Sequence, residues 1–392
     1  MHAEKLCHKW LADVFPEMHK VRRLALGAVV SGVLRRGRLT VTALGRSIRS
    51  TAKVKHNIKR ADRLCSNSHL QRESAELYAR MSEQIVGEAP IILIDWSDID
   101  ARREFFLLRA AVAVKGRSLT LYEEVHTKKT REKRCTHNQF LRNLKNILPT
   151  HCKPIIVTDA GFRTPWFHEV VRLGWDYIGR VRNREMMRRS INTEWIGAKS
   201  LYEQATAKAK LFTNTALTQS NPICCSLVLF KGKPKGRKRL TKMKRAARNN
   251  TSLKNSARAR EPWLLATSLH HSSPKSIVRA YSTRMQIEES FRDLKCPRTG
   301  MSLYHNGTYK LERMKVLLLI GSIATNFAWL LGALARKMNA HKQFQANTTF
   351  SQSVLSNVFI AAQLFRCSKI KIPWILFKKQ IYLTNSNYNY TI

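Results

Sequence analysis

Apolar and polar positions alternate in different ways along the chain, and the changes predict its secondary structure. Residues 1–88 have a mostly helical pattern. From about residue 89, short apolar runs are bounded by turn residues, which is typical of β-strands. The segments "APIILIDWSDI", "EFFLLRAAVAVKG" and "SLTLYEEVH" predict three successive strands, and "KPIIVTDAGF" and "WDYIGRVR" predict two more after intervening helices. The predicted order is therefore βββαβαβ, an α/β fold.

The segment "YSTRMQIEESFRDLK", residues 281–295, predicts one continuous helix, because good helix formers dominate it and neither glycine nor proline interrupts it. Steps of three, four and seven residues return to the same side of a helix, so one face would carry Tyr281, Arg284, Glu288 and Lys295. A solvated face with ion pairs is the alternative interpretation.

The most apolar stretch is "VLLLIGSIATNFAWLLGALA", residues 316–335, which has no charge and is long enough to span a bilayer. It contains Ser322, Thr325 and Asn326 and continues from a charged helical region, so we favour a buried core helix over a membrane span. The first ten residues lack the apolar run of a secretory signal. No membrane partner is expected.

The net charge of the chain indicates what kind of partner the protein binds. The 392 residues include 70 Lys and Arg against 26 Asp and Glu, a net charge of +44 that runs from end to end. Such a chain repels itself unless a polyanion is its habitual partner, and nucleic acid is the first candidate. The eight cysteines are irregularly spaced with no CxxC pair, which argues against a zinc or disulfide framework and fits reduced cytosolic thiols.

Two basic segments are candidates for DNA contact. Residues 39–64 predict two short helices around a turn, the layout of a helix-turn-helix, although a basic surface helix has the same pattern. The basic residues of the second helix are Lys53, Lys55, Lys59, Arg60 and Arg63. Residues 231–260 are rich in Lys and Arg and hold no acid, which fits phosphate contact, a mobile loop, or both.

Two acids follow predicted strands: Asp95 ends the first strand and Asp159 ends the fourth. In the order βββαβ the first strand usually lies in the middle of the sheet with the fourth parallel beside it, so the two carboxylates would be neighbours. This is the ribonuclease-H-like arrangement. A third carboxylate from a helix packed on the sheet, for which Glu288 is the candidate, would complete a site for two Mg²⁺ ions that promotes phosphodiester displacement.

Other acids near these positions are alternative ligands. Glu289 lies about 100° round the predicted helix from Glu288, away from the face with Tyr281 and Lys295. Asp98 and Asp100 are possible replacements for Asp95, but we interpret them as turn acids because they lie beyond the predicted strand.

The spacing Tyr281-x2-Arg284-x3-Glu288-x6-Lys295 resembles the signature of the DDE transposases of bacterial insertion sequences, in the family named after insertion sequence four. Five further segments also resemble that family, and the similarity covers about residues 20–365. They are "TAKVKHNIKRADRL", "DWSDI", "LRAAVAVKGRSLTLYE", "VTDAGF" and "EPWLLAT".

The resemblance implies a role for each matching residue. Asp95, Asp159 and Glu288 would be the catalytic triad and bind two Mg²⁺ ions, for which Mn²⁺ would substitute. The residues Tyr281, Arg284 and Lys295 would bind phosphates beside the scissile bond. Trp263 would stack on a base flipped out of the duplex end, with a core role as its alternative.

The resemblance also implies cut-and-paste transposition through a hairpin intermediate by a cytoplasmic, nucleoid-associated bacterial protein. Its partners would be double-stranded DNA, as the element's terminal repeats and as target, and a second copy in a synaptic homodimer. A non-catalytic or decayed DNA-binding protein explains the charge but not the three acids. A tyrosine recombinase fails, because no arginine precedes the HxxR motif of His19 and Arg22.

The expected domains follow from these assignments. Residues 1–88 would form a helical DNA-binding domain, and the ribonuclease-H-like core, a mixed five-stranded sheet with helices, would span 89–183 and 273–340. A β-rich insertion with the basic loop would occupy 184–272, and a helical C-terminal region would occupy 341–392. After about residue 368 the sequence stops resembling the family.

Overall fold

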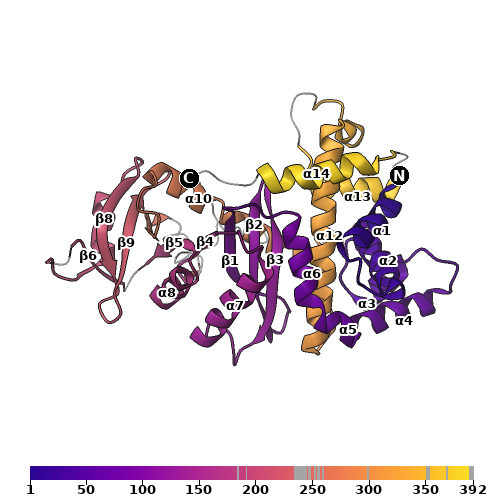
Figure 1. The fold of residues 1–392 in the computed structure, drawn as a ribbon, viewed down its shortest axis with the longest axis horizontal. Helices are drawn as coiled ribbons and strands as arrows, with labels where there is room; N and C mark the ends of the chain where they lie inside the picture. Colours follow the sequence, from indigo (N-terminus) through magenta and orange to yellow (C-terminus); the bar gives the residue numbers. More distant parts are fainter. Residues whose placement is uncertain are drawn as a thin grey trace. The chain divides into compact units, whose positions relative to one another are not determined.

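The structure of the protein is a computed structural model. It describes residues 1–182, 185–190, 192–233, 245, 249–250, 253, 257, 260–297, 300–349, 354–367 and 370–387. The chain forms two compact units (Figure 1). Unit one comprises Met1–Cys152 and the described residues from Met285 onward, and unit two comprises Lys153–Arg284.

Unit one contains an antiparallel meander of three strands, as predicted. These strands are β1 (Ile91–Asp98), β2 (Phe105–Val114) and β3 (Arg117–Thr127). All ten residues of β2 are buried, which suits the central strand of the meander. The turn into β3 contains Gly116 at φ +82°, a left-handed conformation that glycine adopts without a Cβ clash.

Helices make up the rest of unit one, and the mostly helical prediction for residues 1–88 is confirmed. They are α1 (Ala3–Val14), α2 (Lys20–Arg36), α3 (Val41–Ser47), α4 (Val54–Cys65), α5 (Ser68–Arg72), α6 (Ser74–Glu83), α7 (Arg134–Ile147), α11 (Met285–Lys295), α12 (Leu311–Lys337), α13 (Asn357–Cys367) and α14 (Trp374–Asn387). Two 3₁₀ turns accompany them, η2 (Leu303–His305) and η3 (Ala340–Phe344).

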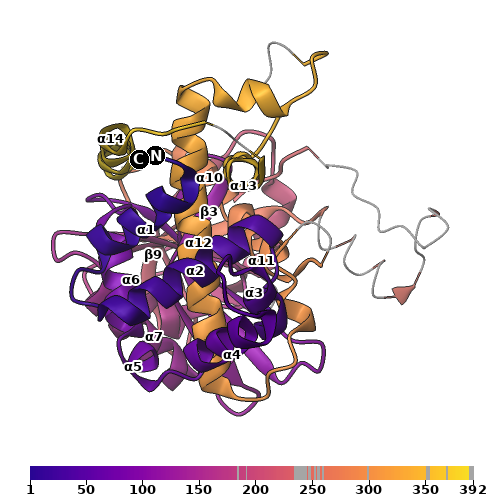
Figure 2. The same cartoon turned by 90° about the vertical axis from the view of Figure 1, so that its right-hand side faces the viewer.

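The central helix of unit one is α12, which packs against α2, α13, α14 and β3 (Figure 2). Within the described part of the chain it alone is long and apolar enough to cross a membrane, and 89% of its most apolar window is buried. The prediction of a core helix for residues 316–335 is therefore confirmed.

The segment after residue 368, where the family resemblance ends, also packs on unit one. Met1 and Ile372 exchange two backbone hydrogen bonds, of 2.7 and 2.9 Å. In α14, Phe377 is fully buried with its ring centroid 5.4 Å from that of Phe327. This segment therefore contributes a helix that packs against α12.

Unit two continues the predicted order. The parallel pair β4 (Ile155–Thr158) and β5 (Asp176–Val181) is connected by α8 (Thr164–Arg172). Antiparallel strands then follow in the spatial order β10 (Trp263–Thr267), β9 (Ile223–Phe230), β8 (Lys210–Leu217), β6 (Met186–Arg188) and β7 (Ile196–Gly197). The remaining elements are η1 (Ala198–Gln204) and α10 (Pro274–Ser282). The molecule is an α/β protein with a mixed sheet and flanking helices, consistent with a ribonuclease-H-like core, so the predicted fold class is confirmed.

The prediction of one helix over residues 281–295 is wrong. Helix α10 ends at Ser282 and α11 begins at Met285, with a turn at Thr283 and Arg284. The hydroxyls of Ser282 and Thr283 donate to the carbonyls of Arg279 and Ala280, at 2.6 and 2.7 Å. Such local side-chain bonds compete with regular helix geometry, which explains the break. Tyr281 and Glu288 therefore do not share a helical face.

Candidate active site and DNA-contact residues

The first predicted ligand, Asp95, lies within β1 and not at its end. Residues Ile91–Ile94 are buried, Asp95–Asp98 are half-buried, and the strand runs on to Asp98. The predicted strand end was wrong by three residues, because the half-exposed polar positions after Asp95 resemble a loop in sequence. Asp95 is thus the first residue of the strand that is not fully buried.

The pairing of β1 with β2 shows which way the Asp95 side chain points. Asp95 lies directly opposite Arg109, and such cross-strand partners share one face of the sheet. Arg109 donates from Nη1 to Ser290 Oγ of α11, at 3.0 Å. Two positions along β1 on the same face, Ser97 accepts a 2.9 Å hydrogen bond from Lys295 Nζ of α11. Asp95 therefore faces the helix that carries Glu288.

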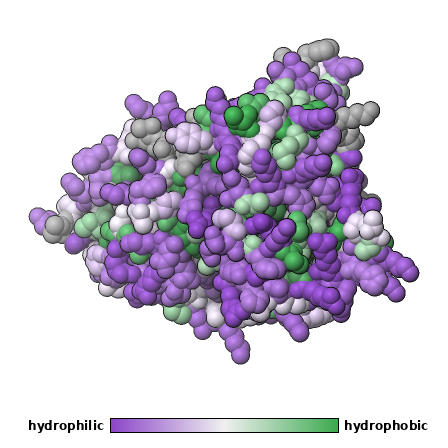
Figure 3. Space-filling view, turned by 45° about the vertical axis from the view of Figure 1, so that its right-hand side comes forward, coloured by the Kyte–Doolittle hydropathy of each residue, from purple (hydrophilic) through white to green (hydrophobic). Residues whose placement is uncertain are grey.

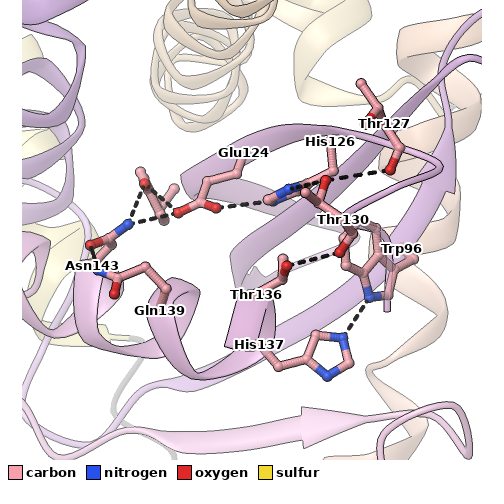
Figure 4. A network of polar contacts seen from close by, with 10 residues as sticks. Trp96, Glu124, His126, Thr127, Thr130, Thr136, His137, Gln139 and Asn143 are labelled. Carbon is pink, nitrogen blue, oxygen red and sulfur yellow. Dashed lines mark hydrogen bonds and ion pairs between the residues drawn. The ribbon is translucent and has the colours of Figure 1, made fainter. Parts of the chain in front are cut away.

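The opposite face of β1 is fixed by α7. Trp96 donates from Nε1 to His137 Nε2 of α7, at 3.0 Å (Figure 4). Burial lowers the pKa of His137 to about 4, so its imidazole is neutral at physiological pH and can accept this bond. Because successive side chains of a strand alternate, anchoring Trp96 to α7 directs Asp95 toward α11.

The two glutamates of α11 point in different directions. Arg117 of β3 pairs with Glu289 at 3.0 Å and with Asp293 at 2.8 Å. Lys295 instead reaches β1, and Glu288 lies seven residues before it, two turns along the same side of the helix. Glu288, which is exposed, therefore lies on the β1 side of α11, and Glu289 lies on the β3 side.

The acids after Asp95 have structural partners. Buried Asp100 accepts the backbone N–H groups of Glu104 and Phe105, both at 3.0 Å, which confirms its interpretation as a turn acid. Asp98 is the last residue of β1 and not a turn residue, and its Oδ1 lies 3.7 Å from Lys295 Nζ. The prediction that Asp98 is a turn acid is therefore wrong, because Asp98 lies in the strand and contacts Lys295.

In unit two, Asp159 directly follows the buried strand β4, as predicted. Its Oδ1 accepts the backbone N–H of Gly161 at 2.8 Å. Tyr281 is 3% exposed, and burial raises the pKa of its phenol, with Asp159 adding to the rise and the charges of Arg284 and Arg180 opposing it. These side chains are therefore close enough to influence one another within unit two.

Trp263 is the half-buried first residue of β10. Its ring lies edge-on to Tyr281, with centroids 4.9 Å apart, and 6.0 Å from the ring of Phe230. This aromatic contact fixes the indole orientation. It is compatible both with a core role and with a preorganised stacking surface.

The predicted ligands are divided between the units. Unit one brings Asp95 and Glu288 to one face with Lys295, and Asp159 belongs to unit two. Among the described residues, no three His, Cys, Asp or Glu side chains gather closely enough to form a metal site. The donor chemistry fits Mg²⁺, because all three side chains offer carboxylate oxygens and none is fully buried.

The predicted helix pair is present as α3 and α4. Gly45 lets the two helices approach closely, since a Cβ there would lie 2.3 Å from Ile58 Cα. On α4 and at its N-cap the exposed cations are Lys53, Lys55, Lys59 and Arg63, whereas Arg60 is half-buried. Hydrophilic residues also dominate the molecular face in Figure 3. Most of the basic segment 231–260 lies outside the described residues.

Sequence reasoning missed Arg109 and Ser290. One signal was available: Arg109 is the single charge in the apolar run "FFLLRAAVAV", and a charge in a buried strand requires partners. The partners themselves could not be identified, because Ser290 lies 181 residues away.

Comparison with known proteins supports the same interpretation of the fold. No curated protein matches the chain. A family model described as "Transposase DDE domain" matches residues 87–327, more than half of the sequence. This range holds all three predicted carboxylates together with β1, β4 and α11, the elements that position them. The chain belongs to the family of proteins with a transposase DDE domain.

Proposed function

We propose that the protein is a cut-and-paste DNA transposase of the family named after insertion sequence four, close to the transposase of insertion sequence ten. The observation that carries the proposal is the orientation of Asp95 toward α11, whose β1 side carries Glu288, in a chain with a transposase DDE domain. A charge of +44 supports DNA as its substrate.

In this proposal Asp95, Asp159 and Glu288 hold two Mg²⁺ ions, with Mn²⁺ as a substitute. The bound ions supply activation of a water or 3′-hydroxyl and stabilisation of the leaving oxygen. Arg284 and Lys295 bind phosphates beside the scissile bond. Tyr281 is too buried to offer much surface to DNA, so we assign it to support Arg284 and Trp263.

DNA recognition is proposed to involve α4, whose exposed cations suit a helix entering the major groove. The protein would bind the terminal repeats of its element, open them through a hairpin intermediate and join the 3′ ends to target DNA as a homodimer. The proposed location is the bacterial cytoplasm, associated with the nucleoid. The predicted domain division, with residues 1–88 as the DNA-binding domain, is part of the same proposal.

The test is cleavage of labelled DNA carrying the element's own end. Wild-type protein with Mg²⁺ is expected to give nicks and then hairpins, and the amide variants Asp95→Asn, Asp159→Asn and Glu288→Gln are expected to lose cleavage while binding DNA in metal-free buffer. Glu289→Gln is the matched control, because Glu289 pairs with Arg117 and should leave cleavage nearly intact.

Two outcomes would contradict this assignment. Cleavage by Glu288→Gln together with loss in Glu289→Gln would move the metal ligand to Glu289. Wild-type binding without any nick or hairpin would favour the second candidate, a non-catalytic or decayed DNA-binding protein of the same fold.

A further inference from the structure

A buried polar network in unit one is centred on Arg109, the single charged residue of β2. Arg109 is 3% exposed and donates from Nε to Glu123 Oε2 at 2.8 Å, with Nη2 2.6 Å from the same oxygen. Glu123 Oε1 accepts from Tyr78 and from Ser322, both at 2.7 Å. The third nitrogen, Nη1, reaches Ser290 of α11. The network thus joins β2 and β3 to α6, α11 and α12.

This network is not explained by stability alone. Replacing a buried ion pair by apolar side chains is often neutral or stabilising, whereas leaving one charge unpaired is strongly unfavourable. Elsewhere α11 is held on the sheet by buried Ile287, Phe291 and Leu294. Apolar contacts of this kind are non-directional, so they hold the helix down without fixing its rotation or its position along its axis.

Hydrogen bonds with defined lengths and angles supply that restraint. Arg117 and Lys295 make such contacts at the half-exposed edges of α11, and the bond from Arg109 to Ser290 is the buried one among these three. Close packing does not supply it on every side, because Arg109, Ser290 and Ser322 border a cavity of about 590 Å³. The restraint acts between the two candidate metal ligands of unit one. Arg109 lies directly opposite Asp95, and Ser290 lies two residues after Glu288.

We propose that Arg109 and Ser290 are positioning residues that hold Glu288 in register with Asp95 for metal binding. The inference rests on the proposed function, since it assumes that both carboxylates bind the divalent ion. Groups that orient the ligands of a metal without touching it commonly change metal affinity by about tenfold or more when they are removed.

The experiment compares Ser290→Ala with Tyr78→Phe in the full chain. Ser290→Ala removes the bond between Arg109 and α11 and keeps the Arg109–Glu123 pair, and Tyr78→Phe removes a bond to the same Glu123 without touching β2 or α11. We measure free Mn²⁺ by electron paramagnetic resonance during titration of the protein bound to DNA with its element's end, the Mg²⁺ dependence of nicking, and the melting temperature.

We expect Ser290→Ala to weaken Mn²⁺ binding about tenfold and to raise the half-saturating Mg²⁺ concentration similarly, with cleavage recovering at high Mg²⁺. Ser290→Thr, which keeps the hydroxyl, should restore both values. Tyr78→Phe should leave both values unchanged even where it lowers the melting temperature.

Equal shifts in Ser290→Ala and Tyr78→Phe would show that the network is only structural and would overturn the proposal, as would unchanged Mn²⁺ binding in Ser290→Ala. Failure of the proposed function has a different signature, because then the wild-type protein itself neither cleaves DNA nor binds Mn²⁺.

Discussion

At the scale of single residues, Trp263 has the most specific testable role. Its indole is held edge-on against Tyr281 at the start of β10. Forming a hairpin at a duplex end requires a base to leave the stack, at a cost of a few kcal/mol, and stacking on an aromatic side chain recovers roughly 1–3 kcal/mol. We expect Trp263→Ala to nick normally and to form hairpins poorly, with partial rescue by Trp263→Phe, in a time course on labelled DNA ends.

The control for this prediction is Phe230→Leu, which removes a second aromatic neighbour of Trp263 and leaves the indole in place. Its hairpin yield should match that of the wild type. If Trp263→Ala slows nicking and hairpin formation equally, Trp263 supports the fold, and normal hairpin yield from the alanine variant would remove its proposed role.

The sequence predicted Glu288 rather than Glu289 as the metal ligand, but for a reason that the structure does not support. The sequence favoured Glu288 because of a helical face shared with Tyr281, and the structure breaks that face at Thr283. Glu288 remains on the β1 side for another reason, since Arg117 holds Glu289 on the β3 side. That pairing spans 172 residues and depends on how α11 crosses the sheet, which sequence periodicity does not specify.

At the scale of elements, α3 and α4 depend on a close approach at Gly45. A Cβ there would meet Ile58 Cα at 2.3 Å, so Gly45→Ala must push the helices apart. Overpacking of this kind typically costs about 1–3 kcal/mol. We expect a lower melting temperature and weaker binding to the element's end, measured by thermal unfolding and gel shift.

Gly307→Ala serves as the matched control, because nothing lies within 4 Å of a Cβ at Gly307. It should melt and bind like the wild type. Gly45→Ala with an unchanged melting temperature would mean that α4 moves aside at little cost, and the close approach would then have no energetic role.

The periodicity of apolar positions predicted most helices and strands, because burial of one face of an element produces that periodicity. It gave the order βββαβαβ, the pair α3 and α4, and the buried α12. It failed at Ser282 and Thr283, where hydroxyls bonded to local carbonyls outweigh good helix formers. The placement of Asp159 beside Asp95 stays a prediction, since it depends on the strand order of the sheet and not on any local pattern.

At the scale of the whole molecule, the charge of +44 attracts DNA, and the response of binding to salt identifies the cations that contact it. Each phosphate that the protein neutralises releases condensed counterions, so removing one phosphate-binding cation changes the slope of log affinity against log salt by about 0.9. A charge spread over the whole chain does not reveal which cations touch DNA. The slope does, because a distant cation contributes to the general field without releasing a counterion from a phosphate.

Lys55 and Lys337 give a matched comparison, since both are exposed lysines of unit one. Lys55 is on α4, which Arg313 near the start of α12 anchors through a 2.8 Å ion pair to Asp62. Lys337 ends α12, a helix of 27 residues and therefore about 40 Å long, at the far end from that anchor. We expect Lys55→Gln to flatten the salt slope by about 0.9 and Lys337→Gln to leave it unchanged, measured by fluorescence anisotropy at several salt concentrations. Equal slopes for the two variants would remove α4 from the DNA interface and leave the charge of the molecule as a general attraction only.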